Sequence, residues 1–164
     1  MTAKLQLDDV KANVITVVPP MRAGDVAMKA GLVNANNRWC AVDWLSMEST
    51  AVKNVHVLGD AVLLAPLMPK SGHMANQHAK VAAAAILNAF EGKGPNATPV
   101  VMNTCYSFVD PGKVIHVASV HQYNAEKKTL ETVAGSGGVS TVPSEAEGAY
   151  GLSWADNIWA DMLS

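Results

Sequence analysis

Thr-Ala-Val-Lys-Asn-Val-His-Val-Leu-Gly-Asp, residues 50–60, is the most informative stretch of this chain. The apolar run 55–58 predicts a buried strand that ends at Gly59 and Asp60. Ligands of open α/β sheets bind at this end of a strand. Glycine there lets a ligand approach the backbone, and a carboxylate accepts a hydrogen bond from a sugar hydroxyl. The pattern indicates a cofactor-binding turn, with an ordinary Gly-Asp turn as the alternative.

Working outward, residues 73–90 predict a long helix. They contain four successive alanines, and Ser71 before them is a typical N-cap. Gly92, followed by Gly94-Pro95, is expected to end the helix. A broad apolar face recurs at helical spacing. Its members are Met74, His78, Val81, Ala85 and residues 87–90.

Shorter patterns flank these two segments. Residues 13–18 predict a buried parallel strand that stops at Pro19-Pro20, and residues 23–30 predict a short helix. Further along, residues 113–121 and 127–133 predict an antiparallel pair of strands. Residues 135–143 predict a loop, and residues 150–163 predict a closing amphipathic helix. The predicted fold is α/β to α+β. Because two parallel strands are too few for a stable doubly wound sheet, we expect the chain to be the tail of something larger.

Composition narrows the function classes. Of 164 residues, 12 are Lys or Arg and 14 are Asp or Glu, which gives a formal net charge of −2. Nucleic acid is therefore not an expected partner, because phosphate contacts need a clustered excess of basic residues. No apolar run is long enough to span a membrane, and the first residues do not resemble a secretory signal.

Cysteine and histidine are sparse. Cys40 and Cys105 exclude a disulfide scaffold and a cysteine-rich zinc site, and leave three options: inert thiols, a mutual disulfide, or a redox cysteine with a partner elsewhere. The five histidines lack metal-ligand spacing, so no metal is expected. His73 and His78, for example, are five residues apart, and core or surface positions are expected for all five.

Several blocks of sequence together carry a resemblance. The pattern Thr50 to Asp60 resembles the second FAD motif of flavoprotein reductases with two dinucleotide-binding domains. More narrowly, the whole chain is similar to the C-terminal part of the flavoprotein subunit of flavocytochrome c sulfide dehydrogenase, a relative of sulfide:quinone oxidoreductases. The blocks are Val18-Pro19-Pro20-Met21-Arg22-Ala23-Gly24, Arg38-Trp39-Cys40-Ala41-Val42-Asp43, Val57-Leu58-Gly59-Asp60-Ala61, Met68-Pro69-Lys70-Ser71-Gly72, residues 75–82 and Asn103-Thr104-Cys105-Tyr106-Ser107.

The resemblance implies a cofactor and site residues. FAD is the implied cofactor, at Gly59, Asp60, Pro69, Lys70, Ser71 and Trp154. Lys70 and the N-terminus of the alanine-rich helix would stabilise negative charge on reduced flavin. Cys105 would form a disulfide with a cysteine outside this chain, which sulfide attacks. An inert Cys105, and a Trp154 that only packs the last helix, are the alternatives; Cys40 is expected to be structural.

The resemblance also implies an organisation and partners. Residues 1–33 would end a second dinucleotide-type domain, residues 34–95 would return to the FAD-binding domain, and residues 96–164 would form a C-terminal flavin-binding domain. The glycine-rich FAD turn, Gly-x-Gly-x-x-Gly, is missing from the sequence. We therefore expect a separate N-terminal FAD-binding portion as a partner, and little catalysis by this chain alone. A c-type cytochrome subunit, sulfide as substrate and a periplasmic location are further implications.

Two other functions stay open. A quinone-reducing relative would place amphipathic helices on a membrane, but residues 150–163 contain no Lys or Arg to attract anionic lipid. A non-catalytic binding or assembly module is the other alternative. An exposed apolar surface would then favour self-association.

Overall fold

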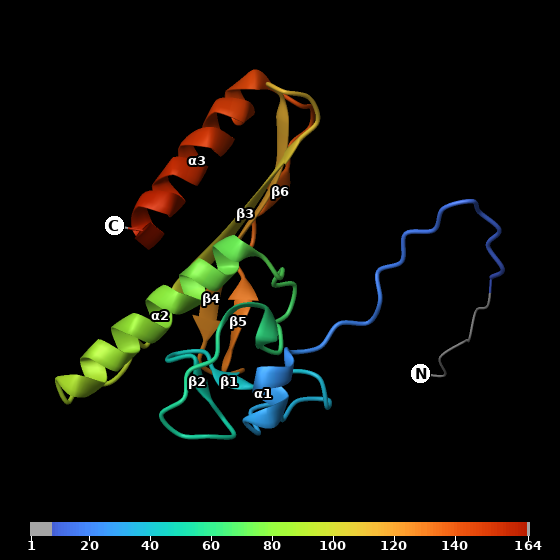
Figure 1. Cartoon of the computed structure of the whole chain (residues 1–164). Coiled ribbons are helices and arrows are strands. Elements are labelled where there is room, and N and C mark those ends of the chain that lie inside the picture. The colour runs from blue at the N-terminus through green and yellow to red at the C-terminus, as the bar shows by residue number, and fades with distance from the viewer. Residues whose placement is uncertain (1–7, 164) are drawn as a thin grey trace.

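The computed structural model describes residues 8–163 as an antiparallel sheet with two long helices and a small lobe of turns (Figure 1). The lobe precedes the first long helix and contains short elements only. Their bounds are α1 at Asp25–Lys29, β1 at Val42–Asp43, β2 at Glu48–Ser49 and the 3-10 helix η1 at Gly59–Ala61. The larger elements are α2 at Gly72–Phe90, β3 at Val100–Phe108, β4 at Val114–Asn124, β5 at Thr129–Thr132, β6 at Gly138–Val139 and α3 at Glu145–Leu163.

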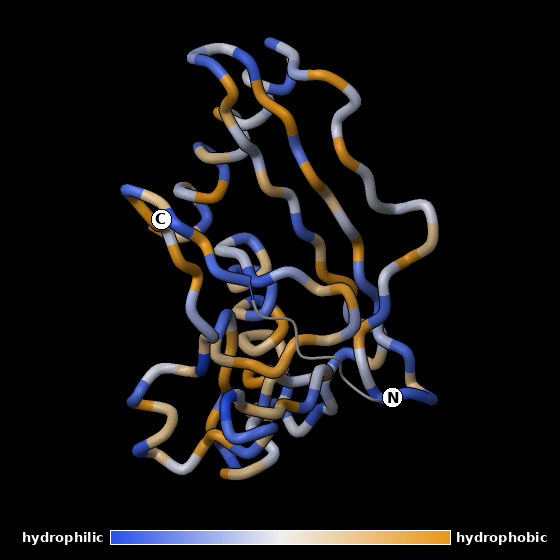
Figure 2. The backbone as a smooth tube through the Cα atoms, turned by 90° about the vertical axis from the view of Figure 1, so that its right-hand side faces the viewer, coloured by the Kyte–Doolittle hydropathy of each residue, from blue (hydrophilic) through white to orange (hydrophobic). Residues whose placement is uncertain are grey.

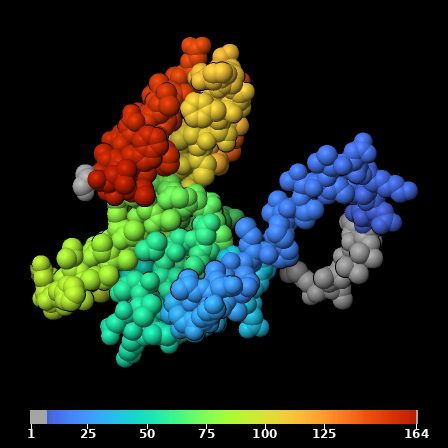
Figure 3. All heavy atoms as spheres, in the orientation of Figure 1, coloured from blue at the N-terminus to red at the C-terminus, as the bar shows by residue number. Residues whose placement is uncertain are grey.

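The predicted buried strand at 13–18 is wrong. This segment belongs to an extended, exposed stretch that projects away from the lobe (Figures 1 and 3). Val14 is 85% exposed and Val18 is 82% exposed. A strand needs a partner for its N–H and C=O groups, and none of the described residues pairs with this segment. The chain joins the lobe at Met21, whose carbonyl accepts from Arg38 Nε at 2.8 Å, and at Ala23, whose N–H donates to the Arg38 carbonyl at 2.7 Å.

The predicted parallel strand at 55–58 is wrong as well. His56 forms a single antiparallel bridge with Glu48, and Leu58 is already 39% exposed. Asn54 has a φ of 61°, so the backbone turns sharply just before the apolar run. All named strand pairs are antiparallel. The α+β part of the predicted fold class is therefore confirmed, and a parallel dinucleotide-binding sheet is not observed in the described residues.

The sheet is organised around β4, the central strand. β5 pairs with one end of β4 and β6 with its middle, while β3 lies along the whole other edge. The predicted antiparallel pair is confirmed as β4 and β5, but β3 was not predicted. The predicted loop 135–143 contains the two-residue strand β6. Hydrophilic and hydrophobic residues alternate along the long strands (Figure 2), as expected of a sheet with two different faces.

The two long helices begin at well-defined caps. Ser71 caps α2, because its Oγ accepts a hydrogen bond from the Met74 N–H at 3.0 Å, as predicted. α3 begins five residues before the predicted position 150, where the Ser144 hydroxyl accepts from the Glu147 N–H. Gly148 allows this start, because a Cβ there would lie 2.2 Å from the Gly112 carbonyl oxygen.

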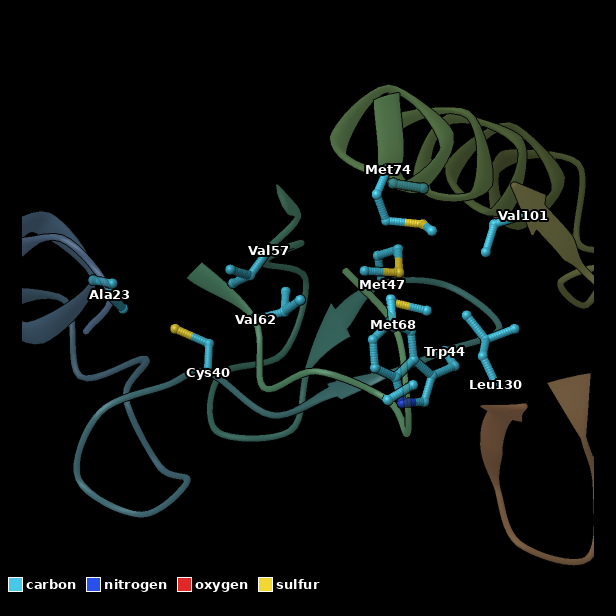
Figure 4. Packing of buried hydrophobic residues seen from close by; sticks show 13 residues of the cluster. Ala23, Cys40, Trp44, Met47, Val57, Val62, Met68, Met74, Val101 and Leu130 are labelled. Carbon is cyan, nitrogen blue, oxygen red and sulfur yellow. The ribbon is translucent and has the colours of Figure 1, made fainter. Parts of the chain in front are cut away.

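The hydrophobic core lies between the lobe, α2 and the lower half of the sheet (Figure 4). Trp44, Met47, Met68 and Met74 meet at its centre. Val101 from β3 and Leu130 from β5 complete it from the sheet side, both about 1% exposed. α3 packs against β4 at the other end of the sheet, so the core fixes α2 while α3 is held separately.

Candidate functional site

A hollow of about 330 Å³ lies where the N-terminus of α2, the middle of β3 and α3 meet. All three elements are required, because each supplies one wall. The lining residues are Ser71, Gly72 and His73 from the start of α2, Thr104, Cys105, Tyr106 and Phe108 from β3, and Gly151, Trp154 and Ala155 from α3. We call this the Cys105 hollow.

The α2 wall is polar because it is a helix N-terminus. The first N–H groups of a helix have no acceptor within it, and they carry a partial positive charge. The Ser71 hydroxyl accepts from the Met74 N–H, while Gly72 and His73, the first two residues of the helix, line the hollow. α2 is 19 residues long, so its dipole is fully developed. This wall favours a ligand group that bears negative charge.

The β3 wall holds Cys105 in a short chain of hydrogen bonds. The Ser71 hydroxyl donates to Asn103 Oδ1 at 2.5 Å, and Asn103 Nδ2 donates to Cys105 Sγ at 3.4 Å. Asn103 is only 3% exposed, so its amide is protected from water. Cys105 is a free thiol within the described residues, half-buried and open to the hollow.

The α3 wall is aromatic. The Trp154 ring lies 5.3 Å from the His73 ring and 5.8 Å from the Tyr106 ring, both in tilted or edge arrangements. Tyr106 in turn packs against Gly151, where a Cβ would approach the ring to 3.3 Å. Trp154 Nε1 is buried and has no hydrogen-bond partner among the described residues. This wall combines a flat apolar surface with an unused donor.

His73 joins the helix to the strand edge. Its Nδ1 accepts a hydrogen bond from the Thr104 N–H at 3.0 Å. Burial lowers the pKa of His73, and the nearby Lys80 charge lowers it further. The ring is therefore held neutral, with Nδ1 as the acceptor, and it contributes shape rather than charge to the hollow.

A second hollow of about 280 Å³ lies on the other side of the loop that precedes α2. Asp60 and Lys70 line it together with Trp39. The Lys70 ammonium donates to the carbonyls of Asp60 and Val62 at 2.6 and 3.0 Å, and it lies 3.9 Å from the Trp39 ring centre. Burial lowers the pKa of Lys70, and the nearby Asp60 charge partly offsets this. Lys70 therefore points into the lobe.

Gly59 contacts α2 at Ala75. Its φ is +68°, and a Cβ there would come within 3.2 Å of the Ala75 Cβ on α2. Its N–H donates to Nδ1 of His78, a side chain that is 1% exposed and packs edge-on against Trp44. Burial, chiefly, lowers the pKa of His78 to about 4. Gly59 thus lets η1 rest directly on the helix.

The structure divides the predicted site residues between these places. Ser71, Cys105 and Trp154 share the Cys105 hollow, whereas Asp60 and Lys70 line the second one. Pro69 lies in the connecting loop, and Gly59 contacts α2. Asn103 and His73 were not predicted as site residues. The sequence signal for Asn103 was its place two residues before Cys105 on a strand, which puts both side chains on one face.

Cys40 is fully buried in the core of the lobe, and burial raises the pKa of its thiol. Among residues 8–163 no group of three or more His, Cys, Asp or Glu side chains could hold a metal ion. No helix in this part of the chain has the length and apolar character needed to cross a membrane.

A sheet edge, a helix N-terminus and an aromatic wall around a cysteine form a site that suits a cofactor-binding domain. Comparison with known families makes this specific. Residues 97–163 match the family model described as flavocytochrome c sulphide dehydrogenase, flavin-binding. The match spans all of β3 to α3 and contains Cys105 and Trp154, whereas Ser71 and Lys70 precede it. The resemblance found in the sequence is confirmed for this C-terminal part.

The residues of the Cys105 hollow fit the flavin that this family binds. The hollow is at the lower end of the ~300–1,000 Å³ range of ligand sites, so it suits one part of a large cofactor. Trp154 and Tyr106 offer flat surfaces to an aromatic ring system. The unpartnered Trp154 Nε1 and the first-turn amides of α2 are donors, and a flavin ring presents acceptors.

Proposed function

We propose that this chain supplies the C-terminal flavin-binding part of an FAD-dependent sulfide dehydrogenase, in which Cys105 is the redox cysteine. The observation that carries the proposal is the position of Cys105. Cys105 lines a hollow whose other walls are the N-terminal turn of α2 and the part of α3 that carries Trp154. A thiol, a positive helix end and an aromatic surface together suit a site that handles negative charge on a flat cofactor ring.

In the proposed reaction, Cys105 forms a disulfide with a cysteine outside this chain. Hydrosulfide attacks the partner sulfur, so that a new S–S bond forms there while the old one breaks and Cys105 leaves as a thiolate. Both electrons of the broken bond stay on the Cys105 sulfur. FAD, when bound, would supply the two-electron acceptor for this site.

The residues of this chain would orient the cofactor and exclude water. Trp154 and Tyr106 would contact the flat ring, and the amides of Gly72 and His73 would face its electron-rich edge. Lys70, held by the carbonyls of Asp60 and Val62, would support the loop rather than touch the ring. The charge at the edge of the ring would therefore come from the α2 dipole.

The remaining parts of the proposal concern partners. A separate N-terminal FAD-binding portion would hold the rest of the cofactor, with residues 1–33, 34–95 and 96–164 divided as the sequence predicts. A c-type cytochrome subunit would accept the electrons, as the name of the matched family implies, and the periplasm would be the location.

Flavin titration tests the proposal. Riboflavin and FAD carry the same ring, so both should bind weakly and show quenched fluorescence, while AMP should not compete. Trp154→Leu should weaken binding about three- to tenfold, the range expected for loss of an aromatic contact. Trp159→Leu is the matched control, because Trp159 is 61% exposed on the same helix.

Three results would count against this function. The first is competition of AMP with the flavin, and the second is the same quenching by Trp154→Leu as by the wild type. The third is the absence of quenching of riboflavin fluorescence at the solubility limit of riboflavin. FAD retained at one equivalent per chain through gel filtration would contradict the two-part site specifically.

A second candidate, an assembly module, is favoured by the exposed apolar side chains of the long helices. Leu87 and Phe90 on α2 are 63% and 85% exposed, and Tyr150 and Trp159 on α3 are similar. Surfaces of this kind favour association. Light scattering that reports a clean monomer at high concentration would exclude self-association through them.

A further inference from the structure

We infer that Asn103 is the positioning residue for Cys105: its buried side-chain amide donates a hydrogen bond to the Cys105 thiolate and is itself oriented by the capping hydroxyl of Ser71. This inference deepens the proposed function and rests on it for its biological meaning. The chemical part, control of one thiol by one amide, is independent of any flavin. Asn103 acts through the cysteine and is not assigned any contact with substrate.

The first step is the orientation of the Ser71 hydroxyl. Its oxygen accepts the hydrogen bond of the Met74 N–H at 3.0 Å, because Ser71 is the N-cap of α2. Its single proton is then free to be donated, and Asn103 Oδ1 lies 2.5 Å away. The N-cap therefore fixes where the serine proton points.

The second step is the orientation of the amide. A separation of 2.5 Å suits an O–H···O bond and is too short for N–H···O, which needs about 2.7 Å or more. The oxygen of Asn103 therefore faces Ser71. The Cys105 sulfur lies 3.4 Å from Nδ2 and 3.7 Å from Oδ1, so the donor Nδ2 is the nearer amide atom and the thiol can also donate to Oδ1. The cap of α2 thus favours the amide orientation that brings the donor closer to the sulfur.

The third step is what the donor does to the sulfur. Hydrogen bonds to a charged acceptor are stronger than those to a neutral one, so the Asn103 N–H interacts most strongly with the sulfur when it leaves a disulfide as a thiolate. At 3% exposure Asn103 is shielded from water, which strengthens the bond. In the proposed reaction this bond would stabilise Cys105 as the leaving group of the disulfide.

Few other groups near the sulfur titrate. α2 contributes His73, which is held neutral, and β3 contributes Tyr106. α3 contributes Gly151, Trp154 and Ala155, none of which titrates, and β4 places Val117 opposite Cys105. His116 on β4 pairs with Tyr106, and its Nδ1 lies 3.1 Å from Glu147 Oε2. The amide is therefore the principal polar partner of the sulfur.

The experiment measures the rate of Cys105 alkylation by iodoacetamide against pH in the full chain. Peptide mass spectrometry separates Cys105 from Cys40, which is fully buried. Asn103→Asp is the decisive variant, because it keeps the acceptor for Ser71 and replaces only the N–H donor by a negative oxygen. We expect the midpoint of its profile to move up by about one pH unit, so that the rate at pH 7.5 falls about tenfold.

Ser71→Ala is the second variant, and it does not touch Cys105. Removing the hydroxyl frees the amide to rotate, so we expect about a threefold slower reaction at pH 7.5. Asn157→Asp, an exposed change on α3, is the control and should keep the wild-type profile. Circular dichroism establishes that each variant is folded; if Asn103→Asp is not folded, Ser71→Ala decides.

A wild-type pH profile in folded Asn103→Asp, or in folded Ser71→Ala where that variant decides, would overturn the inference. The two proposals fail separately. If the pH profiles shift but flavin fluorescence is not quenched, the proposed function is wrong and the role of Asn103 stands. If flavin fluorescence is quenched but the pH profiles do not shift, the role of Asn103 is wrong and the proposed function stands.

Discussion

The buried side chain of His78 makes a prediction about acid stability. Its ring is 1% exposed, its Nδ1 accepts from the Gly59 N–H, and burial lowers its pKa from 6.5 to about 4. In the unfolded chain the ring takes up a proton as the pH falls through 6.5, whereas in the fold it resists until about 4. The free energy of unfolding should therefore fall with pH over this window.

The size of the effect follows from the two pKa values. The difference between 6.5 and about 4 corresponds to about 3 kcal/mol, fully present above pH 6.5 and lost by about pH 4. The lowered pKa values of His73 and His121 add to the loss in the same direction. Because the stability of a small domain is about 5–15 kcal/mol, this loss is easily measured.

The assay is urea unfolding followed by tryptophan fluorescence between pH 7.5 and 4. His78→Gln keeps an acceptor near Gly59 but cannot titrate. Between pH 7.5 and 4, the free energy of unfolding of the wild type should therefore decrease by about 3 kcal/mol more than that of His78→Gln. Asn88→Gln, an exposed change on the same helix, should behave like the wild type. Equal losses in wild type and His78→Gln would refute the reasoning.

Further substitutions test the packing and a second titration. Gly148→Ala should destabilise the fold by about 1–3 kcal/mol in urea unfolding, because the added Cβ would lie 2.2 Å from the Gly112 carbonyl oxygen. Gly72→Ala is the control on a helix, because a Cβ at Gly72 would have open space. A gain in stability for Gly148→Ala would contradict the packing. Leu130→Ala should cost about 2–5 kcal/mol by the same assay, and a cost below 1 kcal/mol would mean that β5 does not close the core. A hydrogen bond from Ser140, and a smaller effect of one from His116, lower the pKa of Glu147. The contribution of Glu147 to the free energy of unfolding should therefore be present at neutral pH and disappear as the pH falls below the usual range of a glutamate. Glu147→Gln should flatten that part of the acid unfolding curve, and an unchanged curve would argue against the pairing.

Local signals in the sequence predicted the helices well. Ser71, the alanine run and Gly92 predicted α2 to within one residue at its start, because caps and helix propensity act within a few residues. α3 was predicted too short. Its first turn is stabilised by Ser144 and by the close approach of Gly148 to Gly112, and that contact joins residues far apart along the chain.

The strands were harder to predict, because a strand depends on a partner. Residues 13–18 and 55–58 have the composition of buried strands, yet the first has no partner and the second forms one bridge. β3 was missed because Asn103, Thr104 and Ser107 interrupt its apolar pattern. These polar residues lie at the edge of the sheet, where Thr104 donates its N–H to His73.

The candidate site was predicted in part. The resemblance named Ser71, Cys105 and Trp154, and the structure brings these three residues to one hollow. The role of Asn103 could not be read from the sequence. It depends on a 2.5 Å contact between a helix cap and a strand residue 32 positions later, and only the folded chain shows such a contact.

The position of β3 has one more consequence. Both walls that flank Cys105 are placed relative to this strand, α2 through His73 and Thr104, and α3 through Trp154 and Tyr106. Inserting one residue before Cys105 would therefore reverse the side of the strand from which its sulfur projects, while both helices could keep their lengths. The spacing from Asn103 to Tyr106 could therefore not change by one residue without moving the sulfur away from Asn103 and Ser71, even if every contact of the two helices were kept.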